Sequence, residues 1–246
     1  MACYAMMIIS KGKEETPHHC VASSKFFMKT HKDTMKILTF NILTAGKDLF
    51  PSRKGWWITR MLGTMRMLKA ENPDIFVLNE VTPLQMFVLL FLKGYKHRGG
   101  LTQNPVFFKK RFKVIESKWK VYDTLSDYLR SYTYVWLKDT ELKHHWEVIG
   151  THIDWDESTR EKQKEEMFKN LCHGTAHKLV CGDFNKEDDT LDYLTPTKPT
   201  TGTYHDINGE GISKIDYIFN NLDIEDCKVL TQYKDISDHY PVVVEF

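Results

Sequence analysis

Short apolar runs rich in β-forming residues dominate the sequence, and several of them end abruptly in a carboxylate, amide or imidazole. KILTFN (residues 36–41) is the first of these runs, and DIFVL (residues 74–78) is another. Between them, apolar residues recur at helical spacing from Ile58 to Leu68. Asn72-Pro73 ends this predicted helix, because proline disfavours helical geometry in the residue before it. Strand and helix therefore alternate in this part of the chain.

The remaining segments are mostly β-rich. Thr82-Pro83 predicts the start of a second helix, which ends near Gly94. The middle of the chain predicts an antiparallel meander of four segments: Val106 to Phe108, Phe112 to Tyr122, Tyr132 to Leu137 and Trp146 to His152. A polar helix then runs from Glu157 to Cys172 and is followed by three strands: Lys178 to Cys181, Lys214 to Phe219 and Tyr240 to Phe246. We predict one mixed α/β domain with its sheets packed between helices.

Composition excludes several classes of protein. The 246 residues include 34 Lys+Arg and 33 Asp+Glu, a balance that argues against coating nucleic acid by bulk charge. The longest apolar run, Met86 to Leu92, is far shorter than the ~20 residues that cross a bilayer, so no stable membrane insertion is expected. The five cysteines are scattered and show no C-x-x-C spacing, which favours a reducing compartment. We therefore expect an intracellular, cytoplasmic protein.

Residues 1–34 differ from the rest of the chain. They show no clear periodicity and lack the basic start and long apolar stretch of a secretory signal. We interpret them as a poorly ordered or non-essential leader, with Met35 as a possible functional start. The predicted domain covers residues 35–246.

The polar residues at the ends of the predicted strands form the strongest functional signal. Each of them alone is compatible with ordinary turn chemistry, so the argument depends on the whole set. Hard divalent cations such as Mg²⁺ prefer oxygen ligands, and histidines near carboxylates suit phosphate contact and proton transfer. The set comprises Asn41, Glu80, His152, Asp154, Asp183, Asn185, Asp216, Asp238 and His239.

In order and spacing, the strings TFN, NPDIFVLNEV, GTH, GDFN, IDYIF and SDHYPVVVEF resemble the endonuclease/exonuclease/phosphatase (deoxyribonuclease-I-like) superfamily. The resemblance covers residues 35–246. It implies a four-layered α/β sandwich, with two mostly antiparallel sheets packed face to face and helices outside. It also implies metal-assisted, in-line attack of water on phosphorus.

The resemblance assigns a role to each matching residue. It implies that Glu80 is the principal ligand of Mg²⁺, which Mn²⁺ can replace, and that Asn41 and Asp238 support it. Asp183 would orient or deprotonate the attacking water, and Asn185 would help to hold the phosphate.

The histidines receive separate roles from the same resemblance. His239 would stabilise the charge that develops on the phosphoryl oxygens, and Asp216 would orient it. His152 would contact the phosphate or assist the leaving group. Some branches pair this second histidine with a glutamate, where this chain has Asn104, and some place an aspartate where it has Leu43. An amide cannot stabilise an imidazolium as a carboxylate does, which weakens the acid role of His152.

A compact branch of the superfamily is the best local match. THIDWDESTREKQ (residues 151–163) and TYHDI (residues 203–207) resemble its motifs, which adds Arg160 and His205 as candidate substrate-binding residues beside Asn104. A solvated charge for Arg160 and a structural hydrogen bond for His205 stay open as alternatives.

We expect a Mg²⁺-dependent phosphoesterase, monomeric, that hydrolyses phosphodiesters in nucleic acid or a nucleotide. Alternatives are an enzyme for a small phosphorylated metabolite, inositol phosphate or phospholipid, and a catalytically silent binding scaffold. Basic and aromatic residues at 109–113 and 118–120 suit a phosphate backbone, or else form a solvated hairpin whose aromatic residues belong to the core.

Overall fold

The computed structural model describes residues 34–45, 56–100, 103–124, 129–171, 174, 176–205 and 209–246. The predicted leader, apart from residue 34, lies outside these ranges. The helices are α1 (Trp57–Glu71), α2 (Pro83–Leu89) and α3 (Glu157–Phe168), with a 3₁₀ turn at Thr231–Tyr233. The strands are β1 (Lys36–Asn41), β2 (Ile75–Asn79), β3 (Tyr95–Arg98), β4 (Val106–Lys109), β5 (Phe112–Val121), β6 (Ser131–Asp139), β7 (His145–His152), β8 (His177–Asp183), β9 (Tyr204–His205), β10 (Gly211–Ser213), β11 (Asp216–Asn220), β12 (Lys228–Val229) and β13 (Val242–Glu245).

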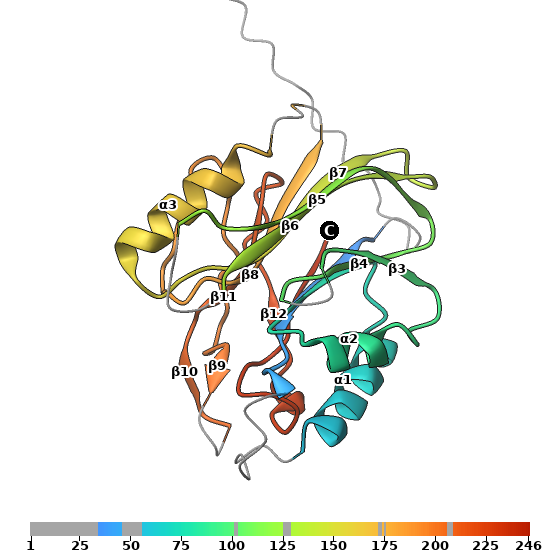
Figure 1. Ribbon diagram of the computed structural model, residues 1–246, viewed down its shortest axis with the longest axis vertical. Coiled ribbons are helices and arrows are strands. Elements are labelled where there is room, and N and C mark those ends of the chain that lie inside the picture. Colours follow the sequence, from blue (N-terminus) through green and yellow to red (C-terminus); the bar gives the residue numbers. More distant parts are fainter. Residues whose placement is uncertain are drawn as a thin grey trace, which may run out of the picture.

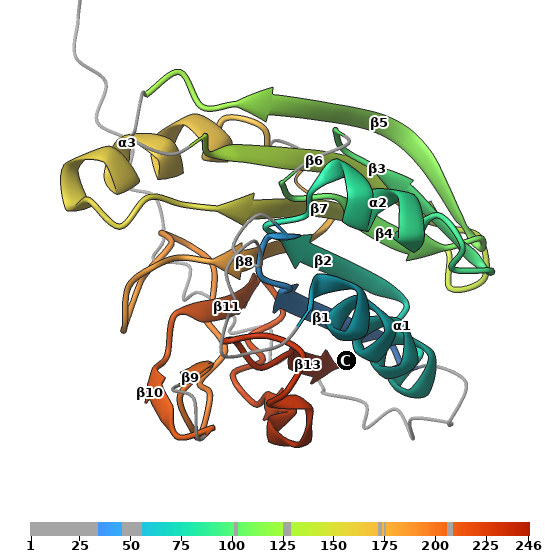
Figure 2. The ribbon, with the colours of Figure 1, turned by 60° about the horizontal axis from the view of Figure 1, so that its bottom comes forward.

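Two large sheets form the centre of the domain (Figures 1 and 2). One has six strands in the order β12-β13-β1-β2-β4-β3, and the other has five in the order β11-β8-β7-β6-β5. β1 and β2 are parallel, as are β7 and β8, and the other neighbours in both sheets are antiparallel. A small β9-β10 sheet completes the described strands. The predicted architecture of two mostly antiparallel sheets is confirmed.

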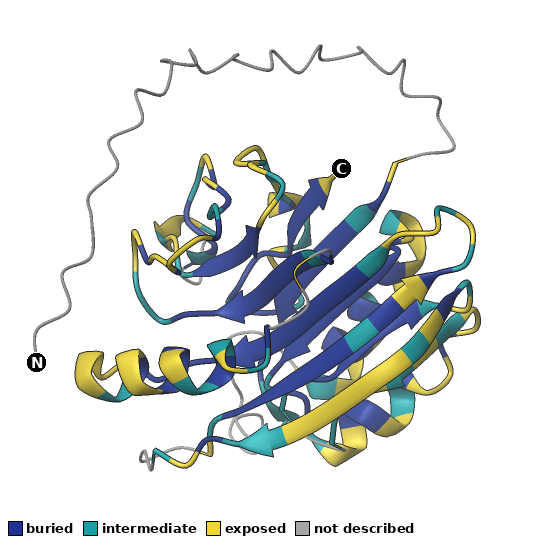
Figure 3. Ribbon diagram, turned by 90° about the horizontal axis from the view of Figure 1, so that it is seen from above, coloured by how far each residue is buried: buried dark blue, intermediate teal, exposed yellow. Residues whose placement is uncertain are grey.

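Three apolar clusters hold the layers together. The first lies between the sheets and includes Val77, Val106 and Val148. A second joins α1 and α2 to the outer face of the six-stranded sheet, and a third joins α3 to the five-stranded sheet. The central strands are buried along their length, whereas the outward faces of α3 and β5 are exposed (Figure 3). The order helix, sheet, sheet, helix gives the four expected layers.

The predicted four-segment meander is wrong in one segment. β5, β6 and β7 do form a meander, but β4 pairs with β2 and β3 in the other sheet. The strand pattern marks residues that fit a sheet, and it does not say which partner they pair with. α3 is also shorter than predicted, because its helical geometry ends at Phe168.

The helix signals near proline behave as their chemistry predicts. Asn72 takes the left-handed conformation, with φ 47°, and ends α1 directly before Pro73. Thr82 caps α2 in a reciprocal capping box with Gln85. No described helix has the length and apolar composition needed to cross a bilayer.

Candidate active site

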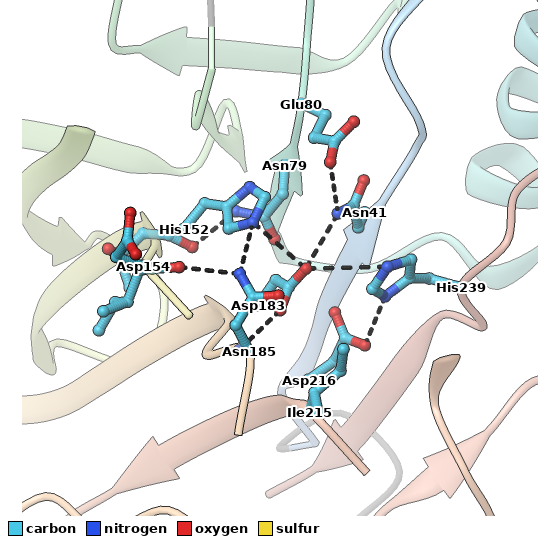
Figure 4. A network of polar contacts seen from close by, with 12 residues as sticks. Asn41, Asn79, Glu80, His152, Asp154, Asp183, Asn185, Ile215, Asp216 and His239 are labelled. Atoms are coloured by element: carbon cyan, nitrogen blue, oxygen red, sulfur yellow. Dashed lines mark hydrogen bonds and ion pairs between the residues drawn. The ribbon is translucent and has the colours of Figure 1, made fainter. Parts of the chain in front are cut away.

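Polar residues from six strands meet at one edge of the sandwich (Figure 4). Asn41 ends β1, and the parallel β2 ends beside it at Asn79, directly before Glu80. His152 and Asp183 end the parallel pair β7 and β8, in register with each other. A strand that is antiparallel to these reaches the same edge with its first residue. Asp216, the first residue of β11, therefore lies opposite Asp183. Asp238 and His239 precede β13, which is antiparallel to β1.

Asp183 stands at the centre of this group and is 2% exposed. Its Oδ2 accepts a hydrogen bond from Asn41 Nδ2 at 3.1 Å and lies 3.4 Å from His152 Nε2 and 3.7 Å from His239 Nε2. Its Oδ1 accepts the backbone N–H of Asn185 at 2.9 Å. Burial, and then the charge of Asp216, raise the pKa of the Asp183 carboxyl to about 7. The group is thereby suited to accepting a proton near neutral pH.

Asp216 and His239 form a buried acid–imidazole pair, with Asp216 Oδ2 2.8 Å from His239 Nδ1. Burial alone would lower the pKa of the imidazole, but the carboxylates of Asp216, Asp183 and Asp238 outweigh it and raise the pKa to about 10. The raised pKa favours the imidazolium form of His239 at neutral pH, and its Nε2 lies 3.7 Å from Asp183 Oδ2. Ser237 Oγ donates to the carbonyl of Asn41 at 2.7 Å, which fixes this segment to the end of β1.

Glu80 lies on the other side of Asp183, with Asn41 between them. Asn41 Nδ2 is 3.3 Å from Glu80 Oε1, and the backbone N–H of Thr44 donates to Glu80 Oε2 at 3.0 Å. Asn41 Oδ1 accepts the N–H of Leu43 at 3.1 Å, so the amide presents its nitrogen to both acids. Leu43, Glu80 and Asn185 all have a positive φ. Residues other than glycine rarely adopt this conformation, and the cases that occur are often found at functional sites.

His152 and Asn185 make the third side of the group. Asn185 Nδ2 is 3.0 Å from His152 Nε2 and donates to the carbonyl of Ile153 at 2.9 Å. The amide is thus fixed between the end of β7 and the acid at the end of β8. Gly182 permits this close approach, because a Cβ at its φ of 152° would stand 1.8 Å from the carbonyl oxygen of Thr151.

The donor set fits a divalent cation. Glu80, Asp183 and Asp238 offer carboxylate oxygens, which Mg²⁺ and Mn²⁺ prefer. Burial and the charge of Asp216 raise the pKa of Asp183, and a bound cation beside this carboxylate would favour its ionised form. Asp183, Asp216 and His239 also place ligand-type atoms within 4.8 Å of one another. Within that trio, His239 Nδ1 is already paired with Asp216 Oδ2, whereas Glu80 and Asp238 line the same pocket as Asp183.

A pocket of about 690 Å³ opens over the group. Among the described residues, its lining includes Glu80, His152, Asp183, Asn185, Asp238 and His239. The pocket is also lined by residues that were not candidates, and these include Arg130, directly before β6, and Tyr204 of β9. Tyr204 meets the ring of His239 edge-on at 5.2 Å between centroids. No strand-end motif marked either residue, although Tyr204 lies within the TYHDI string.

The structure places the three candidate substrate-binding residues outside the described lining of this pocket. Asn104 is buried and hydrogen-bonds to Asn79 at 2.8 Å and to the carbonyl of Ser131 at 2.6 Å, so it links the two sheets. Arg160 is also buried and donates to the carbonyl of Trp155 at 3.0 Å. His205 stacks on Tyr240, with 4.1 Å between the ring centroids. Since successive side chains of a strand point to opposite faces, His205 points away from the face on which Tyr204 lies.

The basic hairpin between β4 and β5 is largely paired with acids. Lys109 lies 2.9 Å from Asp74, and Arg111 contacts Asp74, Asp139 and Glu141. Phe112 is fully buried in the core between the sheets. These contacts give Lys109, Arg111 and Phe112 structural roles, whereas Trp119 on β5 is 41% exposed and does not belong to the core.

This sandwich, with an acidic, histidine-containing pocket at its strand ends, has the architecture that the sequence resemblance implies. The sequence model of the Endonuclease/Exonuclease/phosphatase family matches residues 38–239, and the chain belongs to this family. No curated protein sequence matches the chain.

Several solved structures share the fold. A mannosyl-6-phosphatase from Bacteroides thetaiotaomicron aligns with a TM-score of 0.69 at 19% identity, over 86% of this chain and 99% of its own. Truncated TDP2 from Caenorhabditis elegans aligns with a TM-score of 0.66 at 17% identity, over 87% and 98%. The catalytic domain of human Nocturnin aligns with a TM-score of 0.66 at 18% identity, over 86% and 93%. At these identities the likeness establishes the fold alone.

Proposed function

We propose that this protein is a metal-dependent phosphoesterase that hydrolyses phosphodiester bonds, in nucleic acid or a nucleotide, by in-line attack of water. One observation carries the proposal: the Asp216–His239 pair faces Asp183 within a single pocket. Glu80 and Asp238 line the same pocket. A general base and a fixed cation on one phosphoryl group are what such a displacement requires. The named activities of similar folds, a mannosyl-6-phosphatase among them, agree with phosphoester chemistry.

Each side chain of the site has a task in the proposed mechanism. Asp183 receives the proton of the attacking water, since its pKa of about 7 allows it to gain a proton at neutral pH. His239 donates its Nε2–H to a phosphoryl oxygen as charge builds there, and Asp216 holds the imidazolium. Asn185 and His152 lie beside the base and contact the phosphate. A cation held by Glu80 and Asp238 supplies further charge neutralisation when bound.

Removing the metal tests the proposal. With Mg²⁺ or Mn²⁺, we expect turnover of bis-p-nitrophenyl phosphate that EDTA abolishes and added metal restores. p-Nitrophenyl phosphate serves as the monoester comparison, and turnover of the monoester alone would assign a phosphatase. A panel of single- and double-stranded DNA, RNA, 2′–5′ oligoadenylate and inositol phosphates then identifies the substrate class. No metal-dependent turnover on any of these would favour the binding scaffold.

Arg130 offers a second prediction. It is the one lysine or arginine among the described residues of the pocket lining, in a pocket otherwise rich in carboxylates. A guanidinium there would attract the anionic substrate in both ground and transition states. We expect Arg130→Gln to raise KM about tenfold with a smaller change in kcat, and Arg130→Lys to retain part of the affinity. Steady-state kinetics on the preferred substrate measure both values, and an unchanged KM would contradict this role.

A further inference from the structure

Helix α2 and the segment that directly follows it, residues 90–92, present large apolar side chains on two opposite faces. Met86, Leu89 and Leu92 are buried against the six-stranded sheet, as an amphipathic helix requires. The opposite face exposes Leu84, Phe87, Leu90 and Phe91, each more than half exposed, and we call these four residues the α2 apolar face. The rings of Phe87 and Phe91 pack edge-on, with 5.6 Å between their centroids, so these two side chains form a continuous apolar surface. An exposed apolar patch of this kind marks an interaction surface.

The exposed charged side chains of α1, α2 and the segments beside them are all basic, and the acids Glu71 and Glu80 of this part of the chain are only partly exposed. Within residues 56–94, the exposed charged side chains are Arg66, Lys69 and Lys93, and no exposed residue there is Asp or Glu. α1 covers the same sheet beside α2 (Figure 2). Its residues Ile58 and Leu62 are also exposed. Aromatic and leucine side chains flanked by lysine and arginine form the composition of elements that lie in an anionic lipid interface. A second copy of the chain would instead bring the same positive charges together.

The α2 apolar face also adjoins the active site. Thr82, which caps α2, and Pro83, its first residue, both line the pocket. A surface bound to α2 would therefore lie near the pocket. We propose that the α2 apolar face docks the protein peripherally on an anionic phospholipid surface, with the active-site pocket held close to that surface. This docking goes beyond the proposed function, and it is measured as binding without turnover.

The test is co-sedimentation of the full chain with vesicles, in EDTA so that no bound metal bridges the site to headgroups. We expect binding to phosphatidylcholine vesicles with about 30 mol% phosphatidylserine, and at least about tenfold weaker binding to phosphatidylcholine alone. Salt at about 0.5 M should weaken the binding, because it screens the basic residues. The double variant Phe87→Ser/Phe91→Ser should lose at least about tenfold in affinity, and Lys93→Glu should lose less.

Ile115→Ser is the matched control, since Ile115 is exposed on β5 of the other sheet and should bind like wild type. Circular dichroism and turnover of a soluble substrate should stay unchanged in the double variant. Wild-type protein that remains in the supernatant, or equal binding by the double variant, would overturn the proposal. A concentration-dependent dimer that the double variant abolishes would assign the face to a second copy, and would overturn it too.

Discussion

Asp183→Ala is expected to lower kcat by about 10³-fold or more while the protein stays folded. Asp183 Oδ2 lies within 3.7 Å of nitrogen atoms of Asn41, His152 and His239, so its loss removes the proposed base and a carboxylate near both histidines. Since these effects act on the transition state, kcat should fall more than KM changes. Steady-state turnover with saturating Mg²⁺ measures the effect. Asp192→Ala, at an exposed position, is the control, and near-wild-type turnover in Asp183→Ala would overturn the assignment.

The fold should tolerate loss of this charge. Burial and Asp216 raise the pKa of Asp183 to about 7, far above the ordinary value of 3.8. The ionised form is therefore disfavoured in the folded protein, and its cost grows as the pH rises from 3.8 toward 7. In metal-free protein above pH 7, Asp183→Asn should keep or raise Tm, because it removes the cost of burying this charge. The neutral amide attracts the His239 imidazolium less than the carboxylate does, and this offsets part of the gain in stability. A retained Tm beside lost turnover separates a catalytic role from a structural one.

Asp216→Asn should change the pH dependence of activity more than any other substitution in the site. In the wild type, neighbouring carboxylates raise the pKa of His239 to about 10, so the imidazolium persists at alkaline pH. Without Asp216, burial dominates and the proton leaves at a much lower pH. Activity that needs the imidazolium is then lost as pH rises. We expect the alkaline limb of the kcat/KM profile to move down by at least about two pH units.

Two companion variants sharpen this result. His239→Ala should be nearly inactive at every pH, because it removes the donor itself. Asp223→Asn, which changes a carboxyl whose Oδ1 accepts from Thr195 on the exposed surface, should keep the wild-type profile. An unshifted limb in Asp216→Asn would show that the Asp216–His239 pair does not control the catalytic proton.

Most of the site residues that could be predicted from the sequence lie at the ends of strands. An apolar β-run followed by a polar residue marks both a strand and its end, and this pattern selected Asn41, Glu80, His152 and Asp183 without structural knowledge. Arg130 was missed because it directly precedes a strand, β6, and no motif marked it. Asn79 was missed as an inter-sheet link, because its hydrogen bonds to Asn104 and to the carbonyl of Thr151 join distant segments.

Neighbouring residues within one motif show the same limit. In the strand β9, Tyr204 lines the pocket while His205 stacks on Tyr240. Alternation along a strand requires opposite faces for the two, but the sequence does not say which face meets the pocket. Arg160 is similar, since its helical position was predicted and its burial against the carbonyl of Trp155 was not.

By itself, the sequence indicated the three helices, the strands other than the short β3, β9, β10 and β12, and the family, because these depend on local spacing, capping and an ordered set of motifs. Tertiary structure decided what depends on partners distant along the chain. It moved β4 into the six-stranded sheet, set the acids and imidazoles around Asp183 and shifted their pKa values through burial. It also divided the apolar run from Met86 to Leu92 into a buried face and an exposed one, a distinction that hydrophobicity alone cannot make when both faces of a helix are apolar.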